Sequence, residues 1–167
     1  MNDKKFWHFF DNKTEFNQLF KDQVKREWLN FSTATEEQFA EFLKGRGDII
    51  CKPIDGSSGQ GIFKCTPDEY GDVHALYEKL KAAGIGIVED KVIQHEVISA
   101  LCPTSVNTIR VATLLGDKKE GIVYAYIRIG NGKVMDNVDC GGMAAPIDLD
   151  TGIISGVGAN KAGEAYE

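Results

Sequence analysis

Apolar side chains recur at steps of three and four residues through the first quarter of the chain. They are Phe6, Phe9 and Phe10, then Phe16, Leu19 and Phe20, and then Val24, Trp28 and Leu29. This spacing predicts helices over residues 3–31. A further helix is predicted over residues 35–43, where Thr35 and Gln38 have the spacing of a capping box.

Beyond residue 47 the pattern changes to short apolar runs and to alternation of apolar and polar positions. The short runs predict strands over 48–53, 62–65 and 85–89, with a helix over 67–83. Alternation predicts strands over 106–115 and 121–129, and shorter ones near 133–138, 143–148 and 152–158. The glycine-containing end, from residue 156 onward, is expected to be a loop. Together these elements predict an α+β fold with antiparallel strands.

Composition narrows the classes of function. The 167 residues carry 19 Lys and Arg against 25 Asp and Glu, a net charge of −6, and 43% of them are hydrophobic. This mixture is typical of neither disordered nor fibrous proteins. The acidic balance argues against broad nucleic-acid binding, because phosphate neutralisation needs a basic face. No apolar run approaches the ~18 residues that cross a bilayer, and the N-terminus lacks the apolar core of a signal peptide.

Four cysteines are spread widely along the chain, at Cys51, Cys65, Cys102 and Cys140. They form no C-x-x-C pair and no cluster with histidine, so the sequence predicts no zinc site. Reduced, mostly buried thiols are the expected state, which favours a reducing, cytoplasmic compartment.

A glycine-rich loop follows the first predicted strand and its last lysine, Lys52. Its glycines and serines are Gly56, Ser57, Ser58, Gly59 and Gly61. The backbone N–H groups of such a loop can converge on an anion, the hydroxyls add donors, and Lys52 can reach the same phosphates. The order of residues matches neither a Walker A loop nor G-x-G-x-x-G. A phosphate-binding loop and a flexible hairpin loop with a surface lysine both fit this segment.

Polar groups also follow the strand predicted over 85–89. Adenine needs an acceptor for its amine and a backbone donor for its ring nitrogen, while a ribose diol favours a carboxylate. Glu89, Val92 and Glu96 have the residue types and order for these three tasks. A solvated strand end explains the same residues equally well.

Two arginines stand on consecutive predicted strands, Arg110 and Arg128. An arginine in an otherwise apolar strand is costly unless it meets an anion, so both are candidates to hold a phosphoryl group or an acyl phosphate. Strand parity can place both on one face of the sheet. Cross-strand ion pairs with Asp or Glu are the alternative. Asp148 and Asp150 are candidate magnesium ligands, but their segment is more typical of a hairpin turn.

Taken together, these segments resemble the ATP-grasp superfamily, in particular its sugar-transfer-associated, alpha-L-glutamate ligase-like branch. The matching segments are Asp11 to Lys13, Lys52 to Ile62, Val88 and Glu89 with Gln94 and His95, Ser105 to Val111, Arg128, and Asp136 and Asn137 with Gly141 and Gly142. Their order and spacing carry the resemblance over roughly residues 11–160.

The resemblance implies a two-lobe, ATP-grasp-type architecture, which we expect to be incomplete at both ends. It divides the chain into an N-terminal helical segment (1–47), a central lobe with the glycine-rich loop (48–100) and the start of a C-terminal lobe (101–167).

The resemblance also implies an ATP site. Lys13 and Lys52 correspond to the two phosphate-binding lysines of the family, and the loop from Gly56 to Gly61 to its cover over the phosphates. Glu89, Asp90 and Val92 match the adenine hinge, and Glu96 the ribose contact. Arg110 and Arg128 match the arginines that face the γ-phosphate and the acyl phosphate. Substrate contacts are expected at Asn107 and Asn137.

Proteins of this kind activate a carboxylate as an acyl phosphate and pass it to an amine, with ATP and Mg²⁺. The family holds Mg²⁺ through an Asp or Glu and then a Glu-x-Asn pattern, which this chain lacks, so its metal ligands stay unassigned. For that reason we do not expect these residues to catalyse the reaction alone. A nucleotide- or anion-binding module without turnover, and an interaction domain that docks a second copy or a missing lobe through its N-terminal aromatic residues, are the alternatives.

Overall fold

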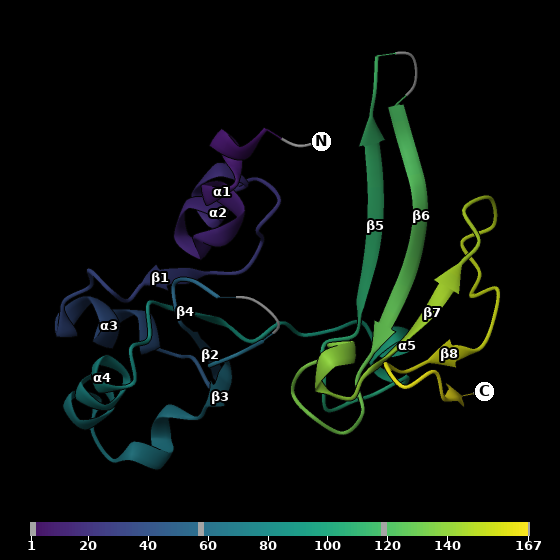
Figure 1. Ribbon diagram of the computed structural model, residues 1–167. Helices are drawn as coiled ribbons and strands as arrows, with labels where there is room; N and C mark the ends of the chain where they lie inside the picture. The colour runs from purple at the N-terminus through teal and green to yellow at the C-terminus, as the bar shows by residue number, and fades with distance from the viewer. Residues whose placement is uncertain (1–2, 57–58, 118–119, 167) are drawn as a thin grey trace. The chain divides into compact units, whose positions relative to one another are not determined.

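The computed structural model describes residues 3–56, 59–117 and 120–166, and the chain forms two compact units, residues 1–92 and 93–167. Each unit combines short helices with one antiparallel sheet (Figure 1). The α+β class predicted from the sequence is therefore confirmed. The first strand, at residues 28–30, pairs with the strand at residues 87–90 and so joins the sheet of the first unit. The division into three parts that the resemblance implies remains a prediction.

The first unit contains ten helices and strands in its described residues. In chain order these are η1 (Lys4–Phe6), α1 (His8–Asp11), α2 (Lys13–Leu19), β1 (Trp28–Asn30), α3 (Glu36–Leu43), β2 (Ile49–Lys52), β3 (Phe63–Cys65), η2 (Pro67–Tyr70), α4 (Val73–Ala82) and β4 (Ile87–Asp90). The strands form one sheet in the order β1-β4-β2-β3. In Figure 1 the short helices α1 and α2 lie apart from α3 and α4.

The two faces of this sheet carry different kinds of side chain, because successive residues of a strand point to opposite faces. One face carries Ile49, Cys51 and Val88, which pack with Phe39 of α3 and Leu76 of α4. These side chains form the hydrophobic core of the unit, and all of them are at most 1% exposed. Burial of this face accounts for the amphipathic pattern of α3 and α4.

The other face carries Lys52 and Glu89. In the register of β2 with β4, Lys52 is opposite Ile87 and Ile50 is opposite Glu89. Lys52 and Glu89 are therefore diagonal neighbours on one face, within reach of long side chains.

The second unit contains α5 (Glu96–Ser99), β5 (Thr108–Leu115), β6 (Glu120–Ile129), η3 (Val138–Cys140), β7 (Met143–Ile147), β8 (Gly158–Ala159) and β9 (Ala165–Tyr166). Its strands form a sheet in the order β5-β6-β7-β8-β9, and β5 and β6 make the long hairpin seen in Figure 1. This hairpin carries exposed apolar side chains, among them Leu115, which is 82% exposed.

The capping box predicted for the helix at 35–43 is confirmed. Thr35 accepts a hydrogen bond from the backbone N–H of Gln38, and the Gln38 side chain accepts one from the N–H of Thr35. This reciprocal pair satisfies two backbone donors at the start of α3 and fixes where the helix begins.

The helical prediction for residues 3–31 is wrong over its last part. Helix α2 ends at Leu19, and Trp28–Asn30 form strand β1. The three residues pair with Ile87 to Glu89 of β4. This pairing outweighs the weak local preference for a helix, and Trp is itself enriched in strands.

Three smaller predictions also differ from the structure. Residues 133–138 form no strand; the next element is the 3-10 turn η3. The helix predicted over 67–83 is divided into η2 and α4 at Gly71, whose φ of +79° a helix does not adopt. The end expected to be a loop contains β8 and β9, which pair through Gly158 and Ala159.

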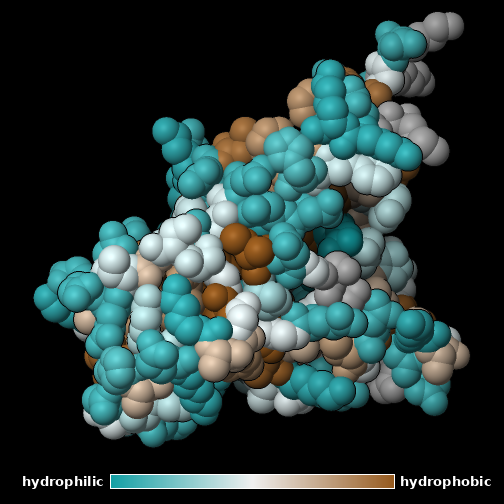
Figure 2. Space-filling view, turned by 60° about the vertical axis from the view of Figure 1, so that its left-hand side comes forward, coloured by the Kyte–Doolittle hydropathy of each residue, from teal (hydrophilic) through white to brown (hydrophobic). Residues whose placement is uncertain are grey.

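Most of the surface in Figure 2 is hydrophilic, and apolar residues appear on that face in small separate groups. Within the part of the chain that the structure describes, no helix combines the length and the apolar character needed to cross a bilayer.

Candidate functional site

The lysine at the start of α2 holds the beginning of the glycine-rich loop. The Lys13 ammonium donates to the backbone carbonyls of Asp55 and Gly56, both at 3.0 Å, and to that of Ile54 at 3.4 Å. The Lys13 backbone N–H also donates to the Ile54 carbonyl, at 3.1 Å. The structure thus brings Lys13 to the loop that begins just after Lys52, although 38 residues separate the two lysines in the sequence.

The second lysine lies beside a buried carboxylate. The Lys52 ammonium contacts Glu89, whose side chain is 4% exposed. Arg26, which precedes β1, lies on the same carboxylate, with its Nε 2.8 Å from Glu89 Oε2. Two cations therefore share one buried anion on the face of the sheet opposite the hydrophobic core.

Burial and charge both perturb the lysines of this cluster. Desolvation lowers the pKa of Lys52 to about 8, and the positive charges of Arg26 and Lys13 act in the same direction. The nearby Glu89 carboxylate opposes this drop, because it favours the ammonium. Desolvation also lowers the pKa of Lys13, against the attraction of Asp55. The repulsion of Lys52 by Arg26 and Lys13 shows that positive charges outnumber negative ones around this side chain.

The glycines of the loop adopt conformations that other residues avoid. Gly56, Gly59 and Gly61 have φ values of +97°, +79° and +69°. A side chain at any of them would be strained, so the loop depends on glycine for its course. The predicted Ser57 and Ser58 contacts lie outside the described residues.

The residues expected to form the adenine hinge have three different environments. Glu89 is buried and committed to Lys52 and Arg26. The Asp90 carboxylate is 2.7 Å from Arg46 Nε and also accepts a hydrogen bond from the backbone N–H of Glu27. Val92 is 43% exposed at the end of the first unit. Their contacts with adenine remain a prediction.

Arg128 is the centre of a polar cluster in the second unit. Its guanidinium donates to Thr108 Oγ1 at 2.9 and 3.0 Å and to Asn137 Oδ1 at 2.7 Å. It also lies 3.0 Å from Asp136, whose side chain is 7% exposed. An ion pair with an acidic residue is therefore present for this arginine, but Asp136 lies in the segment after β6 and not on a neighbouring strand. Asn137 accepts a hydrogen bond from the same guanidinium.

Arg110 lies on the same face of the sheet as Arg128. In the register of β5 with β6, Arg110 is opposite Tyr126 and Thr108 is opposite Arg128. The two arginines are thus diagonal neighbours, as parity predicted. Arg110 is exposed, and we find no salt bridge to it within the described residues. The part of either arginine in phosphoryl transfer remains a prediction.

The side chain of Asn107 has a structural task in the second unit. It is 4% exposed, its oxygen accepts hydrogen bonds from Ser105 and Gly130, and its nitrogen donates to Gln94 and Ile98. These bonds tie the start of β5 to the end of β6. Its contact with a substrate remains a prediction, as does that of the exposed Glu96, the first residue of α5, with ribose.

Residues 3–56, 59–117 and 120–166 contain no group of three or more His, Cys, Asp or Glu that can hold a metal ion. Asp148 accepts hydrogen bonds from the backbone N–H and the hydroxyl of Thr151. This arrangement is the turn that the sequence favoured over a magnesium site. Within these ranges we therefore assign no ligand to Mg²⁺.

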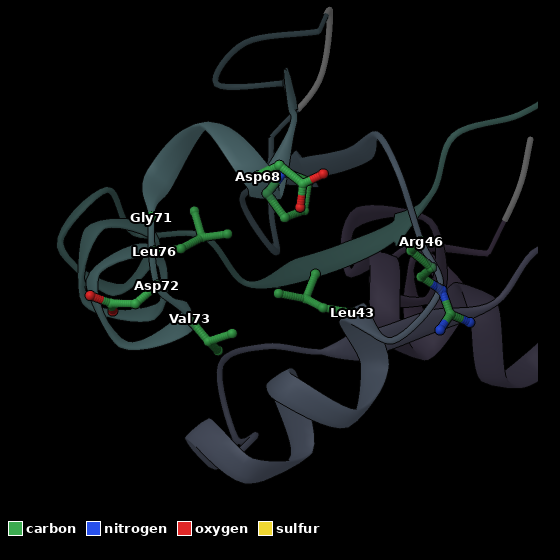
Figure 3. A pocket seen from close by; sticks show the side chains of 8 residues that line it. Leu43, Arg46, Asp68, Gly71, Asp72, Val73 and Leu76 are labelled. Carbon is green, nitrogen blue, oxygen red and sulfur yellow. The ribbon is translucent and has the colours of Figure 1, made fainter.

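A small pocket of the first unit lies away from these groups. It has a volume of about 180 Å³ and is lined by residues of α3, η2 and α4, including Leu43, Asp68 and Val73 (Figure 3). A pocket for a ligand of nucleotide size measures several hundred Å³, so this one is too small. Neither Lys13 nor Lys52 lines it.

Sequence reasoning missed Arg26. The residue stands in a charged stretch, Lys25-Arg26-Glu27, that was assigned to a helix. Only the pairing of Trp28 with Glu89 brings Arg26 beside that carboxylate. Had residues 28–30 been predicted as a strand, their pairing with the strand that carries Glu89 would have pointed to Arg26.

Comparison with known proteins gives a match to one family and to two curated relatives. The sequence model of the family described as sugar-transfer associated ATP-grasp matches residues 1–167. Two curated relatives, the glutathione synthetases of Neisseria meningitidis serogroup A and serogroup B, are each 29% identical to the chain over 136 residues. The match covers 72% of this chain and 37% of each relative, so the chain spans well under half of their length.

Proposed function

This chain belongs to the sugar-transfer-associated ATP-grasp family, and on that basis we propose that it is the ATP-binding part of an ATP-dependent carboxylate–amine ligase. The observation that carries the proposal is the placement of Lys13 and Lys52 at the glycine-rich loop, with a third cation, Arg26, beside them. An excess of positive charge next to a loop of exposed backbone suits the phosphates of a nucleotide. The name of the curated relatives, glutathione synthetase, supports ligase chemistry.

In the proposed reaction a carboxylate oxygen of the acid attacks the γ-phosphorus of ATP. The bond to the β,γ-bridging oxygen breaks, ADP leaves, and an acyl phosphate forms. The amine substrate then attacks the acyl carbon, and inorganic phosphate leaves as the amide forms. Lys13 and Lys52 hold the phosphates, and Arg128 and Arg110 stabilise negative charge on the acyl phosphate.

Several finer points belong to the same proposal. ATP enters as its Mg²⁺ complex, and we assign the ion no ligand on this chain. The acid and amine belong to the assembly of a surface polysaccharide or the cell envelope, which the family's description suggests. The free, buried thiols of Cys51, Cys65 and Cys102 suit a reducing compartment, which supports a cytoplasmic location.

Calorimetric titration of the chain with Mg-ATP tests the nucleotide site. The variant Lys52→Met loses a charged contact to phosphate worth about 1.5–3 kcal/mol, so we expect affinity to fall by about 10- to 100-fold. Lys64→Met is the matched control, because Lys64 lies on β3 and pairs with Asp48. Equal affinity for ATP in wild type and Lys52→Met contradicts the proposal.

Turnover separates the ligase from a module that only binds nucleotide. A pool of carboxylic acids with hydroxylamine as the amine traps an acyl phosphate as a hydroxamate. A ligase that contains this chain releases ADP in proportion to hydroxamate, whereas a binding module binds ATP and releases neither product. From the 167 residues alone we expect ATP binding without turnover.

A further inference from the structure

Arg26 is the one member of the charged cluster that neither the sequence motifs nor the family comparison assigns. It lies in the segment between α2 and β1, two residues before Trp28. Because Trp28 pairs with Glu89, this segment lies at the Asp90 end of β4, and the guanidinium reaches Glu89 from there. Lys52 is opposite Ile87 and reaches the same carboxylate from the other end of the strand. Its side chain is 30% exposed, so it is accessible from solvent on one side.

The charges of this cluster do not balance. Lys52 and Arg26 share the single buried carboxylate of Glu89. Lys13 is close enough to lower the pKa of Lys52 by repulsion, as does Arg26. The neighbouring carboxylate of Asp90 is already paired with Arg46. Three cations thus have one buried carboxylate, Glu89, and one exposed carboxylate, Asp55, beside them, and a further anion at this place would relieve their repulsion.

The guanidinium also has an unsatisfied donor. Arg26 Nε is 2.8 Å from Glu89 Oε2, yet among the described residues its buried N–H has no hydrogen-bond partner, since it does not point at that oxygen. A buried donor on a cation is normally hydrogen-bonded. The buried Nε therefore stays beside Glu89 through charge, and a ligand has to bind the other N–H groups of the partly exposed guanidinium.

We infer that Arg26 is a third phosphate-binding cation of the site, which takes a polyphosphate chain together with Lys13 and Lys52. The inference rests on the proposed function and extends it to a residue outside the motifs. When the phosphates engage the Lys52 ammonium, Glu89 keeps Arg26 as its counter-ion, and the remaining N–H groups of the guanidinium bind phosphate oxygen. Arginine suits both tasks, because its planar fork donates to two anions at once.

The spacing of the cluster favours a polyphosphate over a single phosphate. Lys13 reaches the loop at Asp55 and Gly56, whereas Arg26 and Lys52 meet at Glu89 on the sheet. One small anion cannot neutralise cations that are anchored at two places, but a chain of phosphates can. Tripolyphosphate is therefore the probe that isolates this part of a nucleotide.

Calorimetric titrations of the whole chain with tripolyphosphate, ATP and adenosine test the inference. We expect Arg26→Gln to weaken binding of tripolyphosphate and of ATP by about tenfold or more, and to leave adenosine unchanged. Arg26→Lys keeps the charge and is expected to lose less. Lys25→Gln is the matched control, because it removes the same charge from the adjacent, exposed position.

A second measurement uses the wild-type chain and so does not depend on the folding of a variant. Phenylglyoxal modifies accessible arginines, and mass spectrometry locates the adducts. Tripolyphosphate is expected to slow the modification of Arg26, whose side chain is 30% exposed in the free chain. Modification of Arg26 at the same rate with and without tripolyphosphate overturns the inference.

The outcomes separate this inference from the proposed function. If Arg26→Gln binds tripolyphosphate like wild type while Lys52→Met does not, Arg26 is a structural counter-ion of Glu89 and only the inference falls. If wild type binds neither tripolyphosphate nor ATP, both proposals fall.

Discussion

The buried carboxylate of Glu89 offers the most informative single substitution. Glu89→Gln keeps the shape of the side chain and removes its charge, which leaves Lys52 and Arg26 without an anion. Breaking a buried ion pair by removing one partner costs about 3–5 kcal/mol. Glu89 is 4% exposed, but Lys52 and Arg26 are 20% and 30% exposed. Water therefore screens part of the cost, and we expect a loss of about 3 kcal/mol in the free energy of unfolding.

The loss is expected to shrink at higher pH. The pKa of Lys52 in the folded chain, about 8, is lower than its ordinary value of 10.5. The unfolded chain therefore binds more protons than the folded chain between these values, and stability rises with pH in that window. Without Glu89 the Lys52 pKa falls further. The free energy of unfolding of the variant therefore rises more with pH than that of wild type above pH 7. The gain is about 1.4 kcal/mol for each further pKa unit.

Urea unfolding followed by tryptophan fluorescence measures the stability of the first unit, which contains Glu89. The chain has two tryptophans, and both Trp7 and Trp28 lie in the first unit. Glu41→Gln is the control, because its pair with Lys44 is 71% exposed on both sides and contributes at most about 0.5 kcal/mol. A Glu89→Gln chain as stable as Glu41→Gln, or one that loses more stability at pH 9 than at pH 7, would refute this reasoning.

Three further predictions follow from the described contacts. ATP binding at pH 8 is expected to take up about half a proton, because Lys52 is half charged in the free chain and fully charged beside phosphate; heats of binding that are the same in buffers of different ionisation enthalpy would contradict this. Arg128→Met leaves Asp136 buried without its partner, and we expect it to destabilise the second unit by about 3 kcal/mol. Arg110→Met, at an exposed position, is expected to change the stability by less than about 0.5 kcal/mol. Equal rates of amide hydrogen exchange in β6 of the two variants would contradict this prediction. Gly86→Ala would place a Cβ 2.7 Å from the backbone nitrogen of Ile54, whose carbonyl accepts a hydrogen bond from Lys13. We therefore expect weaker ATP binding and a lower Tm than for the control Gly47→Ala, whose Cβ would have no atom within 4 Å. Equal ATP affinity of the two variants would show that the segment at Ile54 does not position the site.

Much of the fold could be predicted because its signals are local. The capping box of Thr35 and Gln38 marks the start of α3, and alternation marks the hairpin of β5 and β6. Strand β1 could not be predicted in this way. Its three residues continue a helical spacing, and only their pairing with β4, about 60 residues later, makes them a strand.

In the candidate site, too, the residues marked by local sequence signals were predicted, and the contacts between distant residues were not. Lys52 and the glycine-rich loop were singled out because they are adjacent in the sequence, and Lys13 because of the family resemblance. The contact of Lys13 with the loop was not predicted and comes from the structure. Arg26 was missed because its meeting with Glu89 depends on β1. Arg128 was recognised as a costly charge in a strand, but its partner Asp136 lies beyond the end of β6 and does not follow from strand parity.

The most direct test of the nucleotide site is covalent labelling with an ATP analogue that carries an acyl group on its terminal phosphate. A neutral lysine amine beside the phosphates attacks the acyl carbon, and ATP leaves. Lys52 suits this reaction, because its pKa of about 8 keeps part of it neutral at pH 7.5. We predict acylation of Lys52 or Lys13, suppressed by excess ATP. Acylation spread over exposed lysines such as Lys64 and Lys91, and unchanged by ATP, would contradict the account.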